Sequence, residues 1–204
     1  MSLNTIIYEK FRNAFEHKCF SLTVIAYKSL LKENTIQLNW NENDISQELC
    51  EIIERNPKKL KYKITVSREH HLTKKNAKVK GFADKLPRID FKMSSFKFRK
   101  EYKYFFEAKR LKENDSGLKR SYITDGIDRF TSKKYPSGCM LGYLLQGNVC
   151  RTVKSINLLL VKDKRSIETL IYKKNHLHKD YFESEHIVIG VLKHLIFDFT
   201  NLSN

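Results

Sequence analysis

The 204-residue sequence predicts a single α/β domain in which the strands lie between helical segments. Apolar residues alternate with polar ones over 60–66, which is typical of a half-buried strand, and the runs 87–91 and 102–109 indicate two more strands. Apolar residues at helical spacing precede these runs, over about 44–55, and return after them, over 120–133. Hydrophobic residues make up 41% of the chain, which is enough for one core.

The segment before the predicted strands is expected to be helical. From Leu3 to Glu33 apolar residues recur every three or four positions, which predicts two helices or one broken helix. The residues Asn41–Asp44 can cap a helix, and the apolar face that follows predicts a helix from about Asp44 to Arg55, ended by Pro57.

The connections between the strands are polar and basic. We expect a loop from Arg68 to Lys78, and a connection from Lys92 to Glu101 that joins the second and third strands as a hairpin.

The last third of the chain is expected to return to helices. Met140–Gln146 and Asn148–Val161 are predicted to be helical, whereas the apolar segment His186–Thr200 fits either a final strand or a buried helix. The single domain then comprises an N-terminal helical extension (1–43), a core with the candidate site (44–146), and a C-terminal helix with a closing apolar element (147–204).

The charge balance favours a polyanionic partner. The chain has 39 Lys and Arg against 23 Asp and Glu, a formal charge of +16. Lysine neutralises phosphate and gains from counterion release, so nucleic acid is the expected partner, bound with a strong salt dependence. A lysine-rich genome composition is the alternative explanation for this charge.

Targeting and zinc signals are missing from the sequence. The apolar run Phe20–Tyr27 is too short to span a bilayer and lacks the layout of a signal peptide, so we expect a cytoplasmic protein without a membrane partner. The four cysteines form no CxxC pair, and we expect reduced core residues; the seven histidines lie away from finger-spaced cysteines, which disfavours zinc.

Two charged residues share one face of a predicted strand. Strand alternation points Glu107 and Lys109 to the same side, and a hairpin with the preceding strand would bring Asp90 close to Glu107. Two carboxylates are typical ligands of Mg²⁺, and a lysine beside them can orient an attacking water. The alternative, a solvated pair at a strand edge, is disfavoured because Glu107 lies between aromatic residues and Ala108.

This arrangement resembles the PD-(D/E)xK nuclease superfamily. Asp90 closes the extended run Arg-Ile-Asp, and after sixteen residues Glu107-Ala-Lys109 closes an aromatic strand. Pro87 lies three residues before Asp90 instead of next to it, which is a departure from the motif. The resemblance covers roughly residues 44–146 and implies a restriction-endonuclease-like core, a mixed sheet flanked by helices in the order αβββαβ, with additional N-terminal and C-terminal helical elements.

The resemblance also implies an activity. Family members are Mg²⁺-dependent phosphodiesterases, so Asp90, Glu107 and Lys109 are the candidate catalytic residues, with Asp90 and Glu107 as metal ligands and Mn²⁺ able to substitute for Mg²⁺. The run from Tyr122 to Phe130, followed by Met140–Tyr143, is similar to bacterial proteins associated with anti-phage defence or restriction. DNA is then favoured over RNA as substrate, and a homodimer or further defence subunits are possible partners.

Further site residues are expected around this core. An acidic residue on the helix before the sheet often completes the metal site in this superfamily, and Glu48 is the candidate, with Glu51 and Glu54 as neighbours on the same helix. Arg129 is placed to reach a phosphate, unless it pairs with Asp125 four residues earlier. The remaining candidate nucleic-acid ligands are basic residues of the hairpin connection: Lys92, Lys97 and Arg99.

The sequence therefore predicts a metal-dependent nuclease that acts on DNA. Two alternatives stay open: a nucleic-acid-binding module without turnover, and a toxin-like nuclease that cleaves RNA.

Overall fold

A computed structural model describes residues 3–71, 88–97, 99–133, 135 and 137–202. The chain runs through α1 (Leu3–Glu33), α2 (Glu42–Arg55), α3 (Pro57–Tyr62), β1 (Thr65–His71), β2 (Arg88–Lys97), β3 (Lys100–Lys112), α4 (Ser116–Ser121), the π-helix η2 (Tyr122–Ile127), α5 (Asp128–Thr131), β4 (Gly138–Gln146), α6 (Val149–Lys162), the 3₁₀-helix η3 (Ser166–Glu168), β5 (Ile171–Tyr172), β6 (Tyr181–His186) and β7 (Gly190–Asp198).

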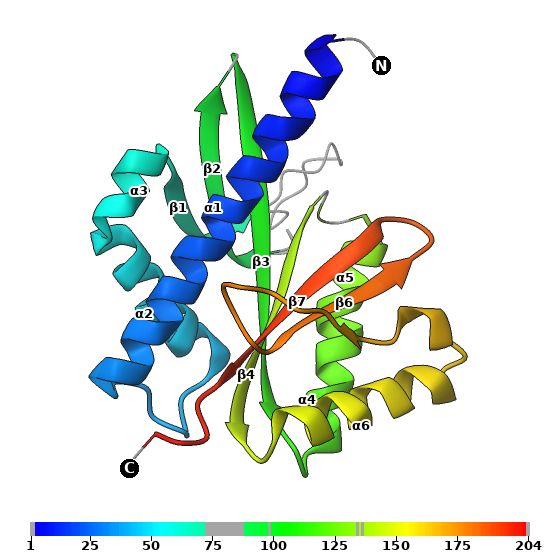
Figure 1. Ribbon diagram of the computed structural model, residues 1–204. Helices are drawn as coiled ribbons and strands as arrows, with labels where there is room; N and C mark the ends of the chain where they lie inside the picture. Colours follow the sequence, from blue (N-terminus) through cyan, green and yellow to red (C-terminus); the bar gives the residue numbers. More distant parts are fainter. Residues whose placement is uncertain (1–2, 72–87, 98, 134, 136, 203–204) are drawn as a thin grey trace, which may run out of the picture.

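The strands form one mixed seven-stranded sheet in the order β1-β2-β3-β4-β7-β6-β5 (Figure 1). β1, β2 and β3 pair in antiparallel fashion, whereas β4 lies parallel to both β3 and β7. β6 and β5 return antiparallel at the far edge. The protein is therefore an α/β protein whose central strands are parallel.

Helices cover both faces of the sheet. α1 crosses one face diagonally beside α2 (Figure 1), and its buried residues, such as Leu22 and Leu30, share a core with Phe106 of β3. On the other face Ile127 of η2 and Ile156 of α6 share a second core with β4 and β7. The sheet thus separates two apolar layers.

The N-terminal region is one long helix. α1 is continuous over 31 residues, so the expectation of two helices or a broken helix was wrong. The helix predicted to begin near Asp44 is confirmed as α2, and Asn41 and Asp44 form its capping box.

The first strand begins later than predicted. Leu60–Tyr62 lies in α3, and β1 begins at Thr65, so the strand expected over 60–66 was wrong over 60–64. Asn56 caps α3 and Pro57 occupies its first turn, where a fixed φ and a missing N–H favour a helix. Of the loop expected over 68–78, residues 68–71 belong to β1, and 72–78 lie outside the described residues.

The predicted hairpin is confirmed, but its connection is much shorter than expected. β2 and β3 pair from Phe91↔Phe106 to Lys97↔Lys100, so most of the expected 92–101 connection is strand. Arg99 lies in the turn with a left-handed φ of 58°. Side chains from Lys92 to Lys97 therefore alternate between two faces of a sheet.

The C-terminal third contains more strand than predicted. Residues 140–146 form β4 and not a helix, because a parallel strand buried on both faces is a continuous apolar run without alternation. The predicted helix over 148–161 is confirmed as α6. The strand alternative for 186–200 is confirmed, since β7 spans Gly190–Asp198, and the closing part of the chain is therefore a set of strands following α6.

Three of the four cysteines are buried and free, as expected, whereas Cys150 is exposed. Within the described part of the chain, none of the helices combines the length and apolar character needed to cross a bilayer.

Candidate active site

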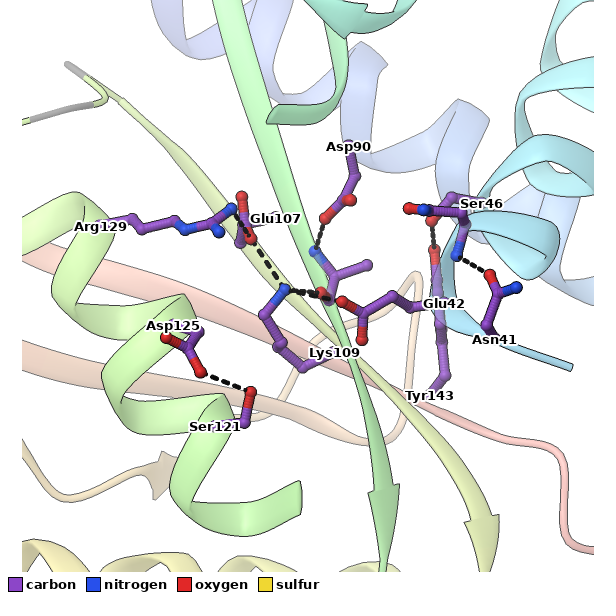
Figure 2. Close-up of polar contacts among 12 residues, drawn as sticks. Asn41, Glu42, Ser46, Asp90, Glu107, Lys109, Ser121, Asp125, Arg129 and Tyr143 are labelled. Atoms are coloured by element: carbon purple, nitrogen blue, oxygen red, sulfur yellow. Dashed lines mark hydrogen bonds and ion pairs between the residues drawn. The ribbon is translucent and has the colours of Figure 1, made fainter. Parts of the chain in front are cut away.

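The candidate site lies where β2 and β3 separate. Their last paired residues are Phe91 and Phe106, so Asp90 and Glu107 lie just beyond the paired region. There the Ala108 N–H donates to Asp90 Oδ2 at 2.6 Å. The Asp90 side chain thus accepts the hydrogen bond that a backbone carbonyl accepts in a paired strand. The predicted hairpin thus brings Asp90 to the middle of β3 (Figure 2).

Glu107 is fully buried and fully paired. Its exposed fraction is 0%, which rules out the solvated strand edge. Oε1 accepts from Lys109 Nζ at 3.0 Å and from Arg129 Nη1 at 2.5 Å. Oε2 accepts from the Tyr135 hydroxyl at 3.1 Å. These charged donors offset the cost of burying a carboxylate.

The Lys109 ammonium lies among three oxygens. It donates to Glu107 Oε1 and Glu42 Oε1, each at 3.0 Å, and to the Ala108 carbonyl at 2.9 Å. Figure 2 shows Glu42 reaching this group from the start of α2 while Glu107 approaches from β3. Oxygens from two elements therefore already converge on a cationic group.

The cluster has an excess of negative charge. Asp90, Glu107 and Glu42 face the two cations Lys109 and Arg129. Burial, reinforced by the nearby Glu107 carboxylate, raises the pKa of Asp90 to about 7. Burial lowers the pKa of Lys109, but Glu107, Asp90 and Glu42 together raise it above its ordinary value, so the ammonium stays charged. Among the three carboxylates, Asp90 is therefore the one whose negative charge the neighbouring cations compensate least.

Arg129 lies beside Glu107, and its predicted contact with a phosphate stays a prediction. It pairs with Glu107, and Asp125 instead accepts from the Ser121 hydroxyl (Figure 2). Gly126 lies against the end of the Met140 side chain, because a Cβ there would lie 2.4 Å from Met140 Cε. With 32% of its side chain exposed, Arg129 also faces the surface.

The structure does not bring the other predicted residues into the cluster. Glu48 is half-buried on α2, and within the described residues the polar contacts of Asp90, Glu107 and Lys109 do not include it. Lys92 is buried on β2 two residues from Asp90, and Lys97 and Arg99 lie at the far end of the hairpin.

Sequence reasoning missed Glu42 and Tyr135. Glu42 follows the N-cap Asn41, and the first turn of a helix favours an acidic residue, so a signal for it existed. Tyr135 lies between α5 and β4, stacked on Phe105, and no local pattern marks it.

A divalent cation suits these donors. Hard cations take carboxylate and carbonyl oxygens, and Mg²⁺ is typically held by one or two carboxylates together with water and substrate phosphate. The raised pKa of Asp90 marks negative charge that such a cation would neutralise. Across the described residues there is no group of three or more His, Cys, Asp and Glu side chains placed to hold a metal unaided.

No family model, curated protein or solved structure matches the chain.

Proposed function

We propose that the protein is a metal-dependent nuclease of the PD-(D/E)xK type. The observation that carries the proposal is a buried, charge-rich site at the point where two paired strands separate, with Asp90 on one strand and Glu107 and Lys109 on the other. The order of elements supports it, because α2, β1, β2, β3, the helices α4 to α5, and β4 follow the αβββαβ order of a restriction-endonuclease-like core.

The cluster suits phosphodiester hydrolysis. The chemistry supplied by a bound Mg²⁺ is neutralisation of the scissile phosphate and easier ionisation of the attacking water. Asp90, Glu107 and the Ala108 carbonyl would hold such a cation through oxygen atoms. Lys109, beside Glu107, orients the attacking water and offsets developing negative charge. Arg129 binds a phosphate oxygen from the exposed part of its side chain.

Nucleic acid is the proposed substrate because the chain carries a formal +16. The preference for DNA, and for a role in restriction or anti-phage defence with a second copy or other subunits, rests on the family resemblance. Cleavage of RNA is the alternative outcome.

The test is incubation of the purified chain with supercoiled plasmid and with total RNA in Mg²⁺, Mn²⁺ or EDTA. We expect cleavage with either cation and none in EDTA. Glu107→Gln and Lys109→Ala should each lower the rate by at least about a hundredfold, as loss of a group that stabilises the transition state does. Thermal unfolding of each variant checks that it folds.

Two glutamates on one helix provide a matched pair. Glu42→Gln should lower the cleavage rate because Glu42 contacts Lys109, whereas Glu48→Gln, the same change further along α2, should leave it within about twofold. Intact substrate under all conditions, with binding retained, would favour a binding module in which Glu107 is a structural ion-pair partner. Cleavage that survives both Glu107→Gln and Lys109→Ala would place the site elsewhere.

A further inference from the structure

One end of the β2–β3 hairpin extends beyond its neighbours in the sheet. β1 pairs with β2 only as far as Ser94, and β4 pairs with β3 only from Phe105 onward. The intervening residues, 95–97 and 99–104, here called the arm, therefore have no strand partner outside β2 and β3 among the described strands. Figure 1 shows this end of β2 and β3 projecting beside the first half of α1.

The helix α1 supports one face of the arm. The ring of Tyr102 meets that of Phe11 edge-on with centroids 4.6 Å apart. The Lys97 ammonium lies 5.1 Å from the Phe11 ring centroid, and that of Lys100 lies 4.5 Å from the Tyr8 ring centroid. These aromatic and cation–π contacts fix the direction of the arm relative to the sheet.

The opposite face of the arm carries exposed aromatic and cationic side chains. Strand alternation places Phe96 on the same face of β2 as Asp90, and 72% of Phe96 is exposed. Lys103 pairs in register with Ser94 and lies on the same face. Its side chain is 40% exposed, and its ammonium lies 2.9 Å from the carboxylate of Glu101.

The arm is also strongly basic. It contains four cationic residues and one acidic residue, a formal +3, and Arg99 is exposed in its turn. Cations beside an exposed aromatic ring form the combination that binds phosphate and stacks on a base.

We propose that the arm is a second nucleic-acid contact, in which its cationic residues bind the substrate backbone and Phe96 stacks on a base. The proposal rests on the proposed function, since it extends the substrate from the candidate site. Phe96 is six residues along β2 from Asp90, which at about 3.3 Å per residue is about 20 Å. That length corresponds to about six base pairs of duplex at about 3.4 Å each.

A shared face favours nucleic acid over an anionic lipid surface. Phe96 and Lys103 lie on the face that carries Asp90 and Glu107, so one extended polyanion can contact the arm and the site together. Binding to an anionic vesicle would not require the arm and the candidate site to share a face, so vesicles serve as the competing probe.

The test compares two double variants with equal charge. The arm variant combines Arg99→Asn and Lys103→Gln, which leave the α1 contacts of the arm intact, and asparagine tolerates the left-handed φ of position 99. The control combines Lys154→Gln and Lys162→Gln, two exposed lysines of α6. Both variants lose two positive charges, and circular dichroism with thermal unfolding checks their folding.

Binding of labelled 24-base-pair duplex and 24-nucleotide single strand is measured in EDTA from 50 to 200 mM NaCl. The arm variant should bind more weakly, with a slope of log K against log salt that is shallower by about 0.9 per lost phosphate contact on duplex. The control should keep the wild-type slope. Phe96→Ala should weaken binding at least about fivefold without changing the slope, because stacking carries no charge.

Equal losses in the arm and control variants would overturn the proposal. So would arm-dependent binding to phosphatidylserine vesicles with unchanged nucleic-acid binding. Because binding is measured without metal, the two proposals fail separately. If the wild type never cleaves but the arm variant loses nucleic-acid binding, only the proposed nuclease activity is refuted. If the wild type cleaves and the arm variant binds as tightly as the wild type, only the proposed role of the arm is refuted.

Discussion

Replacing Asp90 with asparagine should stabilise the protein above neutral pH. The amide oxygen of Asp90→Asn can still accept the Ala108 N–H, whereas the negative charge beside Glu107 is removed. Active-site groups that are unfavourable for stability are retained for function, so the same substitution should abolish cleavage.

The size of the effect follows from the pKa of Asp90. A rise from 3.8 to about 7 corresponds to about 4 kcal/mol at about 1.36 kcal/mol per unit. Asp90 is half-buried, so solvent screening reduces this value, and we expect about 2 kcal/mol. Between pH 4 and 7 the unfolded state has released the proton that the folded state retains, so the free energy of unfolding of the wild type falls as pH rises.

The assay is urea unfolding of wild type and Asp90→Asn at half-unit steps from pH 4 to 8.5. The difference in the free energy of unfolding should grow in favour of the variant between pH 4 and 7 and then level off. Asp125→Asn, at an exposed position, is the control and should show a flat difference. A flat difference for Asp90→Asn, or a variant less stable than wild type at pH 8, would refute the reasoning.

Three further substitutions test the packing and hydrogen bonding of the buried residues. Gly138→Ala should destabilise the fold by about 1–3 kcal/mol, because its Cβ would clash with the backbone carbonyl of Phe105 on the neighbouring strand; an unchanged free energy of unfolding would contradict this packing. Tyr135→Phe removes a donor to buried Glu107, should cost about 1–3 kcal/mol and should slow cleavage; unchanged stability would exclude the hydrogen bond. Ser184→Ala leaves two buried histidine nitrogens unpaired and should cost about 1–3 kcal/mol by urea unfolding; an unchanged free energy of unfolding would exclude this role for the hydroxyl.

Local pattern alone was sufficient for part of the site. The alternation of an extended strand places Glu107 and Lys109 on one side of β3 whatever the rest of the chain does. The capping residues Asn41 and Asp44 likewise mark the start of α2 because a helix end is satisfied within a few residues. These features depend on neighbours in the sequence.

Local pattern was insufficient where burial removed the signal. β4 lies between β3 and β7 with both faces covered, so its apolar run has no alternation to distinguish strand from helix. The start of β1 was misplaced for a different reason, since Asn56 and Pro57 favour a helical turn over the alternation that follows.

The sequence by itself determined two features of this protein. Its charge balance makes the chain basic, and strand alternation places a carboxylate and a lysine on one face of a strand. The tertiary structure decided what surrounds that pair. Where β2 separates from β3 determines how Asp90 bonds to Ala108, and how α2 packs on the sheet determines that Glu42, not Glu48, meets Lys109. Both features depend on contacts between residues that are far apart in the chain. The spacing of apolar residues over a short segment does not predict the geometry of such contacts.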